Sequence, residues 1–234
     1  MSALVVDING LTFAYPDGPA IIDVPSFRIE AGERVFLRGP SGSGKSTLLG
    51  LIAGVLAPAS GSVAVVGEDL AALSSAARDK VRADHLGVIF QLFNLVPYLG
   101  VLENVALPCR FSARRRDAVG GAPKDEARRL LARLGIDDPA MLNRRVVDLS
   151  VGQQQRVAAA RALIGGPQLV IADEPTSALD ADARDRFIEL LSEEAERTGA
   201  ALLFVSHDAS LARQFSRAVD LSDINRAGTR QEAA

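Results

Sequence analysis

The sequence predicts an α/β domain with a parallel-sheet core, an N-terminal antiparallel β-subdomain and a helical insertion. Two continuous apolar runs, Leu169–Ala172 and Ala201–Val205, are typical of parallel strands buried on both faces. Residues 92–148 are rich in Arg, Leu and Ala and have few β-branched clusters, which predicts helices. The first ninety residues contain short β-rich runs: Leu4–Ile8, Leu11–Tyr15, Ser26–Ile29, Arg34–Leu37, Ser62–Val66 and Gly87–Phe90.

Turn and helix signals divide the remaining chain. The segments Asn9-Gly10 and Pro16-Asp17-Gly18 predict turns between the first strands. Periodic apolar residues predict four helices, and a final edge strand is expected at residues 217–221, before a polar tail from residue 226. The four helices are Lys45–Ala53, Asp125–Leu134, Gln153–Ile164 and Phe187–Arg197.

Composition bounds the class of protein. The chain has 234 residues, is 48% hydrophobic and carries a net charge of −3, which argues against a protein that coats nucleic acid. Its one cysteine, Cys109, allows no disulfide within the chain, and we expect it to be a buried apolar side chain. No apolar run approaches the roughly 18 residues of a membrane span, and the first ten residues lack the features of a signal peptide.

The strongest local motif is Gly39-Pro40-Ser41-Gly42-Ser43-Gly44-Lys45-Ser46, which fits GxxxxGK[ST] between a predicted strand and a predicted helix. Small residues allow backbone N–H groups to surround phosphate oxygens, and the helix directs its positive dipole end at the same place. We expect Lys45 to bridge the β- and γ-phosphates of ATP, Ser46 to ligate Mg²⁺ and Thr47 to bond the α-phosphate side. The motif alone indicates a P-loop nucleotide-binding protein.

Two carboxylates, Asp173 and Glu174, end the apolar run Leu169–Ala172. Parallel strands place such residues at the carboxyl edge of the sheet, where nucleotides bind. We expect Asp173 to hold Mg²⁺ through water, and Glu174 to act as the general base that orients the attacking water.

The segment Leu149-Ser150-Val151-Gly152-Gln153-Gln154-Gln155-Arg156 resembles the signature of ABC ATPases, LSGGQ followed by QR. The resemblance implies a P-loop NTPase (RecA-like) fold and two copies of the domain facing each other head to tail. Ser150, Gly152 and Gln153 of one copy would then complete the ATP site of the other. The signature helix would supply a second anion site.

Other positions match the same family one by one. Tyr15 matches the aromatic residue that stacks on adenine, and Gln91 matches the Q-loop glutamine that senses Mg²⁺ and the transport partner. Ser177-Ala178-Leu179-Asp180 resembles the D-loop, in which Asp180 crosses the dimer interface. His207 resembles the switch histidine at the γ-phosphate.

The resemblance also implies the domain boundaries. Residues 1–91 and 149–225 would form the nucleotide-binding core, residues 92–148 the helical subdomain and residues 226–234 a tail. One departure stands out, because Val151 occupies the position of the first signature glycine. A positive φ there would strain valine, so we expect this residue to keep an ordinary backbone conformation.

Residues 90–108 resemble the branch that includes lipoprotein-releasing (LolD), macrolide-exporting (MacB) and cell-division (FtsE) ATPases. This resemblance implies an ATPase that powers a membrane permease on separate chains, at the cytoplasmic face of a bacterial inner membrane. It also allows a periplasmic adaptor, and no nucleic-acid partner is expected. The alternative within the branch is an FtsE-like ATPase that regulates cell-wall hydrolysis through a membrane partner.

Overall fold

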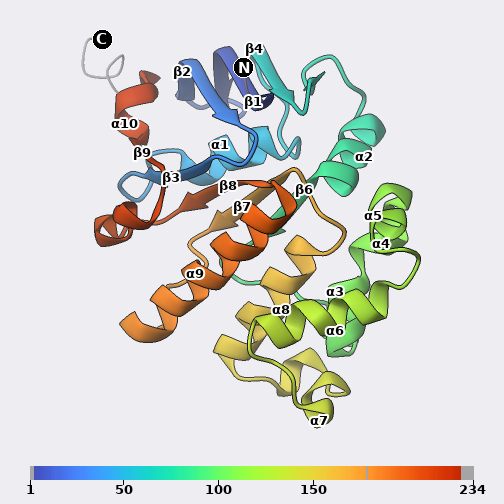
Figure 1. Ribbon diagram of the computed structural model, residues 1–234. Helices are drawn as coiled ribbons and strands as arrows, with labels where there is room; N and C mark the ends of the chain where they lie inside the picture. The colour runs from blue at the N-terminus through green and yellow to red at the C-terminus, as the bar shows by residue number, and fades with distance from the viewer. Residues whose placement is uncertain (1–2, 178, 228–234) are drawn as a thin grey trace. The chain divides into compact units, whose positions relative to one another are not determined.

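The computed structural model describes residues 3–177 and 179–227 and divides into two compact units (Figure 1). The first unit comprises residues 1–82 and 201–234, and the second comprises residues 83–200. Helix α2 (Ser75–His85) leads from the first unit into the second. No helix among the described residues is long and apolar enough to cross a membrane.

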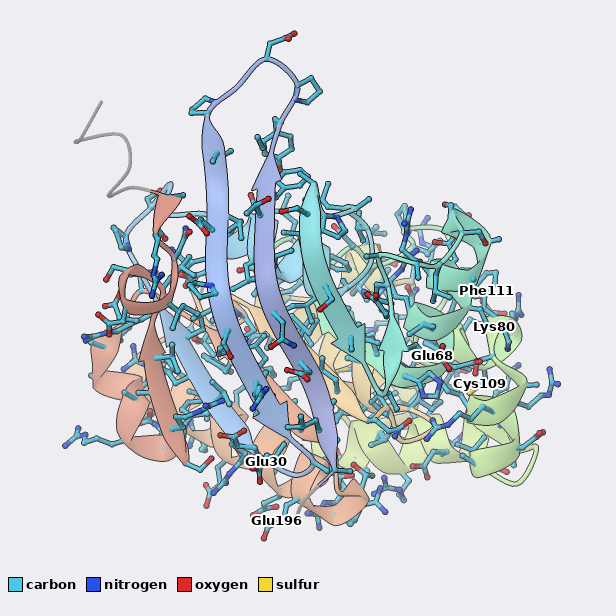
Figure 2. All side chains as sticks on the ribbon, turned by 90° about the horizontal axis from the view of Figure 1, so that it is seen from above. Glu30, Glu68, Lys80, Cys109, Phe111 and Glu196 are labelled. Carbon is cyan, nitrogen blue, oxygen red and sulfur yellow. The ribbon has the colours of Figure 1, made fainter. Side chains whose placement is uncertain are left out.

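An antiparallel sheet in the first unit has the strand order β2-β1-β4-β5, and Figure 2 shows its three long strands side by side. The strands are β1 (Leu4–Ala14), β2 (Ala20–Glu30), β4 (Ser60–Val65) and β5 (Glu68–Asp69). Ile8 pairs with Phe27 of β2 and with Val63 of β4, and all three side chains are buried. The sheet therefore buries one apolar face, as its alternating pattern predicts.

The predicted turn at Asn9-Gly10 is wrong, because β1 continues through it as one strand. Gly10 adopts a φ of 58°, and the register against β4 shifts between Asn9 and Thr12. The positive φ of Gly10 accommodates one extra residue as a β-bulge, and the chain does not reverse direction there. The close approach also requires glycine on β4, where a Cβ at Gly61 would lie 2.2 Å from the Gly10 carbonyl oxygen.

Three parallel strands complete the first unit, with β3 (Arg34–Arg38) paired to both β8 (Ala201–Val205) and β9 (Arg217–Asp220). Phe36, Phe204 and Phe215 pack together, with ring centroids 5.0 to 6.3 Å apart. Helix α1 (Lys45–Ile52) follows β3, a 3-10 helix (Ala209–Gln214) follows β8, and α10 (Leu221–Ile224) follows β9. The predicted edge strand at 217–221 is thus present, whereas α10 lacks any helix-length pattern in the sequence.

The second unit contains a parallel pair of strands, β6 (Leu86–Ile89) and β7 (Leu169–Asp173), together with a set of helices. Helix α8 packs against β6, where a Cβ on Gly87 would lie 2.2 Å from the Ala162 carbonyl oxygen. Glycine thus lets strand and helix backbones touch. The helices are α3 (Val101–Ala106), α4 (Pro108–Phe111), α5 (Ala113–Ala118), α6 (Pro123–Arg133), α7 (Pro139–Leu142), α8 (Val151–Leu163) and α9 (Ala181–Thr198), with a 3-10 turn at Val146–Asp148.

The run Arg114–Arg116 is not a uniformly solvated face, because Arg115 is only 1% exposed. Its guanidinium donates to the carbonyls of Leu86, Ala162 and Ile164. Burial lowers the pKa of Arg115 to about 10, so the group stays charged at neutral pH. Arg115 therefore ties α5 to the start of β6 and to the end of α8. Cys109, on the preceding helix, is buried as expected, and burial raises the pKa of its thiol.

Glu194 of α9 is the acidic centre of an ion network in the second unit, with a side chain 1% exposed. Arg129 of α6 lies 3.1 Å away, Arg133 of α6 3.2 Å and Arg197 of α9 3.1 Å. Burial raises the pKa of Glu194, but hydrogen bonds from Arg129 and Arg197 lower it more, so its pKa is below the usual value. The network joins α6 to α9.

Glu194→Gln is expected to lower the free energy of unfolding by about 1–2 kcal/mol at pH 7, because three guanidinium groups lose their shared anion. Since the folded-state pKa is lowered, this stabilisation is fully present above the unfolded pKa of about 4.3 and is lost as the pH falls through the lower pKa of the folded state. Urea unfolding at pH 7 and at pH 3 measures both effects. Glu193→Gln, which removes a half-exposed carboxylate bonded to Arg133, is the matched control and should change stability little. Equal effects of the two variants would contradict the network.

Candidate active site

The glycine-rich loop connects the carboxyl end of β3 to α1 in the first unit. Gly42 and Gly44 have φ values of 79° and 99°, a conformation that favours glycine. Space is tight at the ends of the loop, because a Cβ on Gly39 would lie 2.8 Å from the Ser43 hydroxyl and one on Gly44 3.0 Å from Ile22. The sequence thus builds a compact turn that ends at the N-terminus of a helix, which is the geometry that binds phosphate.

Two side chains of the loop have donors available for a phosphate. The Lys45 ammonium folds back over the loop and donates to the carbonyls of Gly39 (2.7 Å) and Pro40 (2.9 Å). The Ser43 hydroxyl is buried and has no hydrogen-bond partner among the described residues. A buried hydroxyl without a partner is costly, so a ligand oxygen at this point would be favourable. Ser41 and Ser46 are exposed, whereas Thr47 is buried at the start of α1.

His207 lies at the same sheet edge as the loop. Leu37 of β3 pairs in register with Val205 of β8, and the Ser206 N–H donates to the Leu37 carbonyl at 3.2 Å. Gly39 and His207 therefore each stand two residues beyond a paired position, at the carboxyl ends of adjacent parallel strands. The His207 side chain is exposed there. The first unit thus brings the loop and the predicted switch histidine together.

Tyr15 stands at the end of β1, beside the turn of the β1–β2 hairpin that extends from the sheet in Figure 2. Its ring is 45% exposed and meets the Phe13 ring edge to face, with centroids 5.0 Å apart. An exposed aromatic face braced by a second ring is a suitable platform for a flat base.

The second unit places Gln91, Asp173 and Glu174 at one sheet edge. Ile89 of β6 pairs with Ala172 of β7, so Gln91 and Glu174 each follow that pair by two residues. Asp173 is the last residue of β7. Glu174 adopts a φ of 47°, a conformation that costs an acidic residue of the order of 1–3 kcal/mol and that clusters at functional sites.

The loop after Gln91 is strained and is held by α8. Phe93 and Asn94 have φ values of 60° and 48°. Arg161 of α8 donates to both of their carbonyls, at 2.6 and 2.7 Å. The helix that begins with the signature therefore also fixes the shape of the Q-loop. Sequence reasoning missed Arg161, because these contacts reach backbone atoms 67 and 68 residues away in the chain.

The signature forms the N-terminus of α8, closed by a capping box. The Ser150 hydroxyl accepts from the Gln153 N–H, and the Gln153 side chain accepts from the Ser150 N–H. The first helical bond is made by Gln154 to the Ser150 carbonyl, so the N–H groups of Val151 and Gly152 precede the hydrogen-bonded ladder. Together with the helix dipole they make this end electropositive.

The described part of the D-loop lies beside the signature, and Ala178 is outside the described residues. A Cβ on Gly152 would contact the Leu179 side chain at 3.7 Å. The Asp180 carboxylate caps α9 by accepting from the Ala183 N–H at 2.8 Å. The second unit therefore brings Ser150, Gly152 and Gln153 near the D-loop.

Val151 keeps an ordinary backbone conformation, as expected, since its φ is not positive. It is the first residue of α8, and its side chain is 53% exposed. Val151 is therefore not strained at this position, where the family signature has glycine.

The oxygen donors present suit Mg²⁺. In the first unit Ser46 offers a hydroxyl, and in the second unit Gln91 and Asp173 offer an amide and a carboxylate. Each is an oxygen ligand of the kind that Mg²⁺ takes alongside substrate phosphates and water. Among the described residues no group of three or more His, Cys, Asp or Glu side chains could hold a metal ion. A metal held chiefly by phosphate oxygens requires no such group.

Val151→Gly is expected to lower the free energy of unfolding slightly, by about 0.5 kcal/mol or less. At a helical position without strain, glycine only raises the conformational entropy of the unfolded chain. Chemical denaturation measures the change. A gain in stability of about 1 kcal/mol would instead indicate that valine is strained at this position.

Comparisons with known proteins agree with this geometry. The family described as ABC transporter matches residues 22–177. The macrolide export ATP-binding/permease protein MacB of Rhodopseudomonas palustris (strain BisB18) is 40% identical over 227 residues, which are 95% of this chain and 33% of that protein. The chain thus spans about a third of the length of this relative.

Two solved structures of the bacterial ABC transporter cassette MJ0796 have the same fold. One is described as dimeric and has 33% identity and a TM-score of 0.81, covering 92% of this chain and 93% of that chain. The other, a dimeric post-hydrolysis state bound to ADP and Pi, has 34% identity with the same TM-score and coverage. The predicted P-loop NTPase α/β fold is confirmed. The chain belongs to the ABC transporter family and is an ABC-type ATPase cassette.

Proposed function

We propose that two copies of this cassette close on two ATP molecules and thereby drive a membrane permease of the export or lipoprotein-release type. The observation that carries the proposal is the electropositive N-terminus of α8, which presents Ser150 and Val151 at the surface. An anion site of this kind is only half of an ATP site and needs a nucleotide held by another surface. The phosphate loop of a second copy would supply that surface, and the dimeric MJ0796 cassettes support this arrangement.

Each bound nucleotide would use the residues that the motifs single out. Tyr15 stacks on the base, the loop from Gly39 to Thr47 surrounds the phosphates, and Lys45 turns from its loop carbonyls to the β- and γ-phosphates. Ser150, Gly152, Gln153 and Asp180 would come from the other copy. The cassette thus supplies positioning and charge stabilisation, which is most of what phosphoryl transfer requires.

Hydrolysis then needs one proton transfer. Glu174 orients a water molecule and takes its proton as the water oxygen attacks the γ-phosphorus, while the bond from that phosphorus to the ADP oxygen breaks. His207 contacts the γ-phosphate. Ser46, Gln91 and, through water, Asp173 would hold Mg²⁺, which would neutralise charge on the phosphates.

The permease partner would dock on the apolar surface that follows β6. Phe90, Leu92 and Tyr98 are 41%, 85% and 81% exposed, which is unusual for large apolar side chains so close together in sequence. The relative MacB combines ATP-binding and permease in its name. We infer that the cassette works at the cytoplasmic face of the membrane, where it would meet the permease. Residues 92–148 would act as the helical subdomain that moves with the partner.

Glu174→Gln should slow ATP hydrolysis by at least 100-fold while leaving ATP binding intact, because the amide cannot take the proton. The variant should also accumulate an ATP-bound dimer. Phosphate release and size-exclusion chromatography with ATP measure the two effects.

Glu196→Gln is the matched control, since Glu196 is an exposed carboxylate of α9 in the same unit, labelled in Figure 2. This control should hydrolyse ATP at the wild-type rate and stay monomeric under the same conditions. Turnover of Glu174→Gln equal to that of the control would exclude Glu174 as the general base.

A further inference from the structure

The segment after β9 folds back onto β2, the outer strand of the antiparallel sheet in the first unit. Helix α10 packs against β2 and β9 in the first unit (Figure 1). The Arg226 N–H then donates to the Asp23 carbonyl of β2 at 2.8 Å. Residues 221–227 thus form a strap, here called the C-terminal strap, along the start of β2.

Asn225 is the polar centre of this strap, and its amide uses both of its groups. The oxygen accepts from the Asp23 N–H at 2.8 Å and from the Ala227 N–H at 3.2 Å. The nitrogen donates to the Ile21 carbonyl at 2.9 Å and to the Ser43 carbonyl at 3.4 Å. One side chain therefore joins the strap, β2 and the phosphate loop.

The contact to Ser43 falls where the loop packs closely on β2. Ser43 precedes Gly44, whose φ is 99° and where a Cβ would lie 3.3 Å from the Ile21 carbonyl oxygen. At the other end of the loop, a Cβ on Gly39 would lie 3.3 Å from Leu221 of the strap. Both ends of the loop therefore rest against the strap or against the β2 residues that Asn225 holds.

We propose that Asn225 is a positioning residue for ATP binding: through the Ser43 carbonyl of the loop and the Ile21 carbonyl of β2, it holds the phosphate loop in place before the nucleotide arrives. The inference rests on the proposed role of this loop in binding ATP. A preformed loop lowers the ordering cost of binding, so the effect falls on affinity rather than on chemistry. No sequence motif marks the residue, since Asn225 lies 182 residues from Ser43.

Two substitutions of Asn225 test the donor NH₂ group and the acceptor oxygen of this amide separately. Asn225→Ala removes all four hydrogen bonds. Asn225→Asp retains an oxygen for the Asp23 and Ala227 N–H groups but turns a second oxygen toward the Ile21 and Ser43 carbonyls, where it is repelled. If the alanine variant folds poorly, the aspartate variant still tests the contact to the loop.

Ser216→Ala is the matched control. The Ser216 hydroxyl accepts from the Arg34 N–H at 3.0 Å and donates to the Arg34 carbonyl at 2.7 Å. It tethers β9 to β3 at the amino end of the strand, opposite to the phosphate loop. The control thus removes a side chain that bridges to the backbone of the same parallel strands without touching the loop.

The experiment measures the Kd for N-methylanthraniloyl-ATP by fluorescence, KM and kcat for ATP hydrolysis, and the urea midpoint of each full-length variant. We expect both Asn225 variants to bind about tenfold more weakly and to raise KM in proportion, with kcat at saturating ATP within about twofold of wild type. Ser216→Ala should leave Kd and KM unchanged, whatever its effect on the urea midpoint.

Wild-type Kd and KM in both Asn225 variants, or an equal loss in Ser216→Ala, would overturn the inference. Lys45→Ala serves as the separate test of the loop itself and should weaken binding strongly. If Lys45→Ala binds as wild type does, the proposed function fails; if it binds weakly while the Asn225 variants bind normally, only the role of Asn225 fails.

Discussion

The hydrogen-bonded register of the parallel strands determines where the chemistry of this cassette can occur. In the first unit, the pairing of Leu37 with Val205 puts the glycine-rich loop and His207 at one sheet edge. In the second unit, the pairing of Ile89 with Ala172 does the same for the loops that carry Gln91 and Glu174. Because successive side chains alternate faces, a slip of one residue would move every side chain of either pair to the opposite, differently packed face of the sheet. Burial of both strand faces therefore fixes the positions of the reactive groups.

Polar side chains then hold the loops that leave these edges. Asn225 holds the phosphate loop, Arg161 holds the strained turn after Gln91, and the Ser150–Gln153 capping box holds the signature. Each acts mainly on backbone atoms, so it shapes a loop without occupying the site. Buried Arg115 and Glu194 act further away and join the helices of the second unit to β6 and α9. Within each unit, loops held by single side chains would suit the proposed coupling of ATP binding to a partner.

Sequence reasoning predicted the fold class and the motifs because both depend on local patterns. The apolar run of β7 and the loop before α1 follow directly from residue type and spacing. The prediction failed at Gly10, where a bulge and a turn require the same positive φ and only pairing with β4 decides between them. The burial of Arg115 could not be predicted either, because carbonyls from β6 and α8 compensate it and no local pattern reveals them. Asn225 was missed for the same reason.

The most direct test of the account is a crosslink between the phosphate loop and the signature of two copies. Ser41→Cys and Val151→Cys, both at exposed positions, would be combined in a Cys109→Ala background and treated with a short bismaleimide. We expect a covalent dimer that forms with a non-hydrolysable ATP analogue and is absent without nucleotide, with either single-cysteine protein as control. A double-cysteine protein that binds the analogue but yields no crosslinked dimer would contradict the nucleotide sandwich.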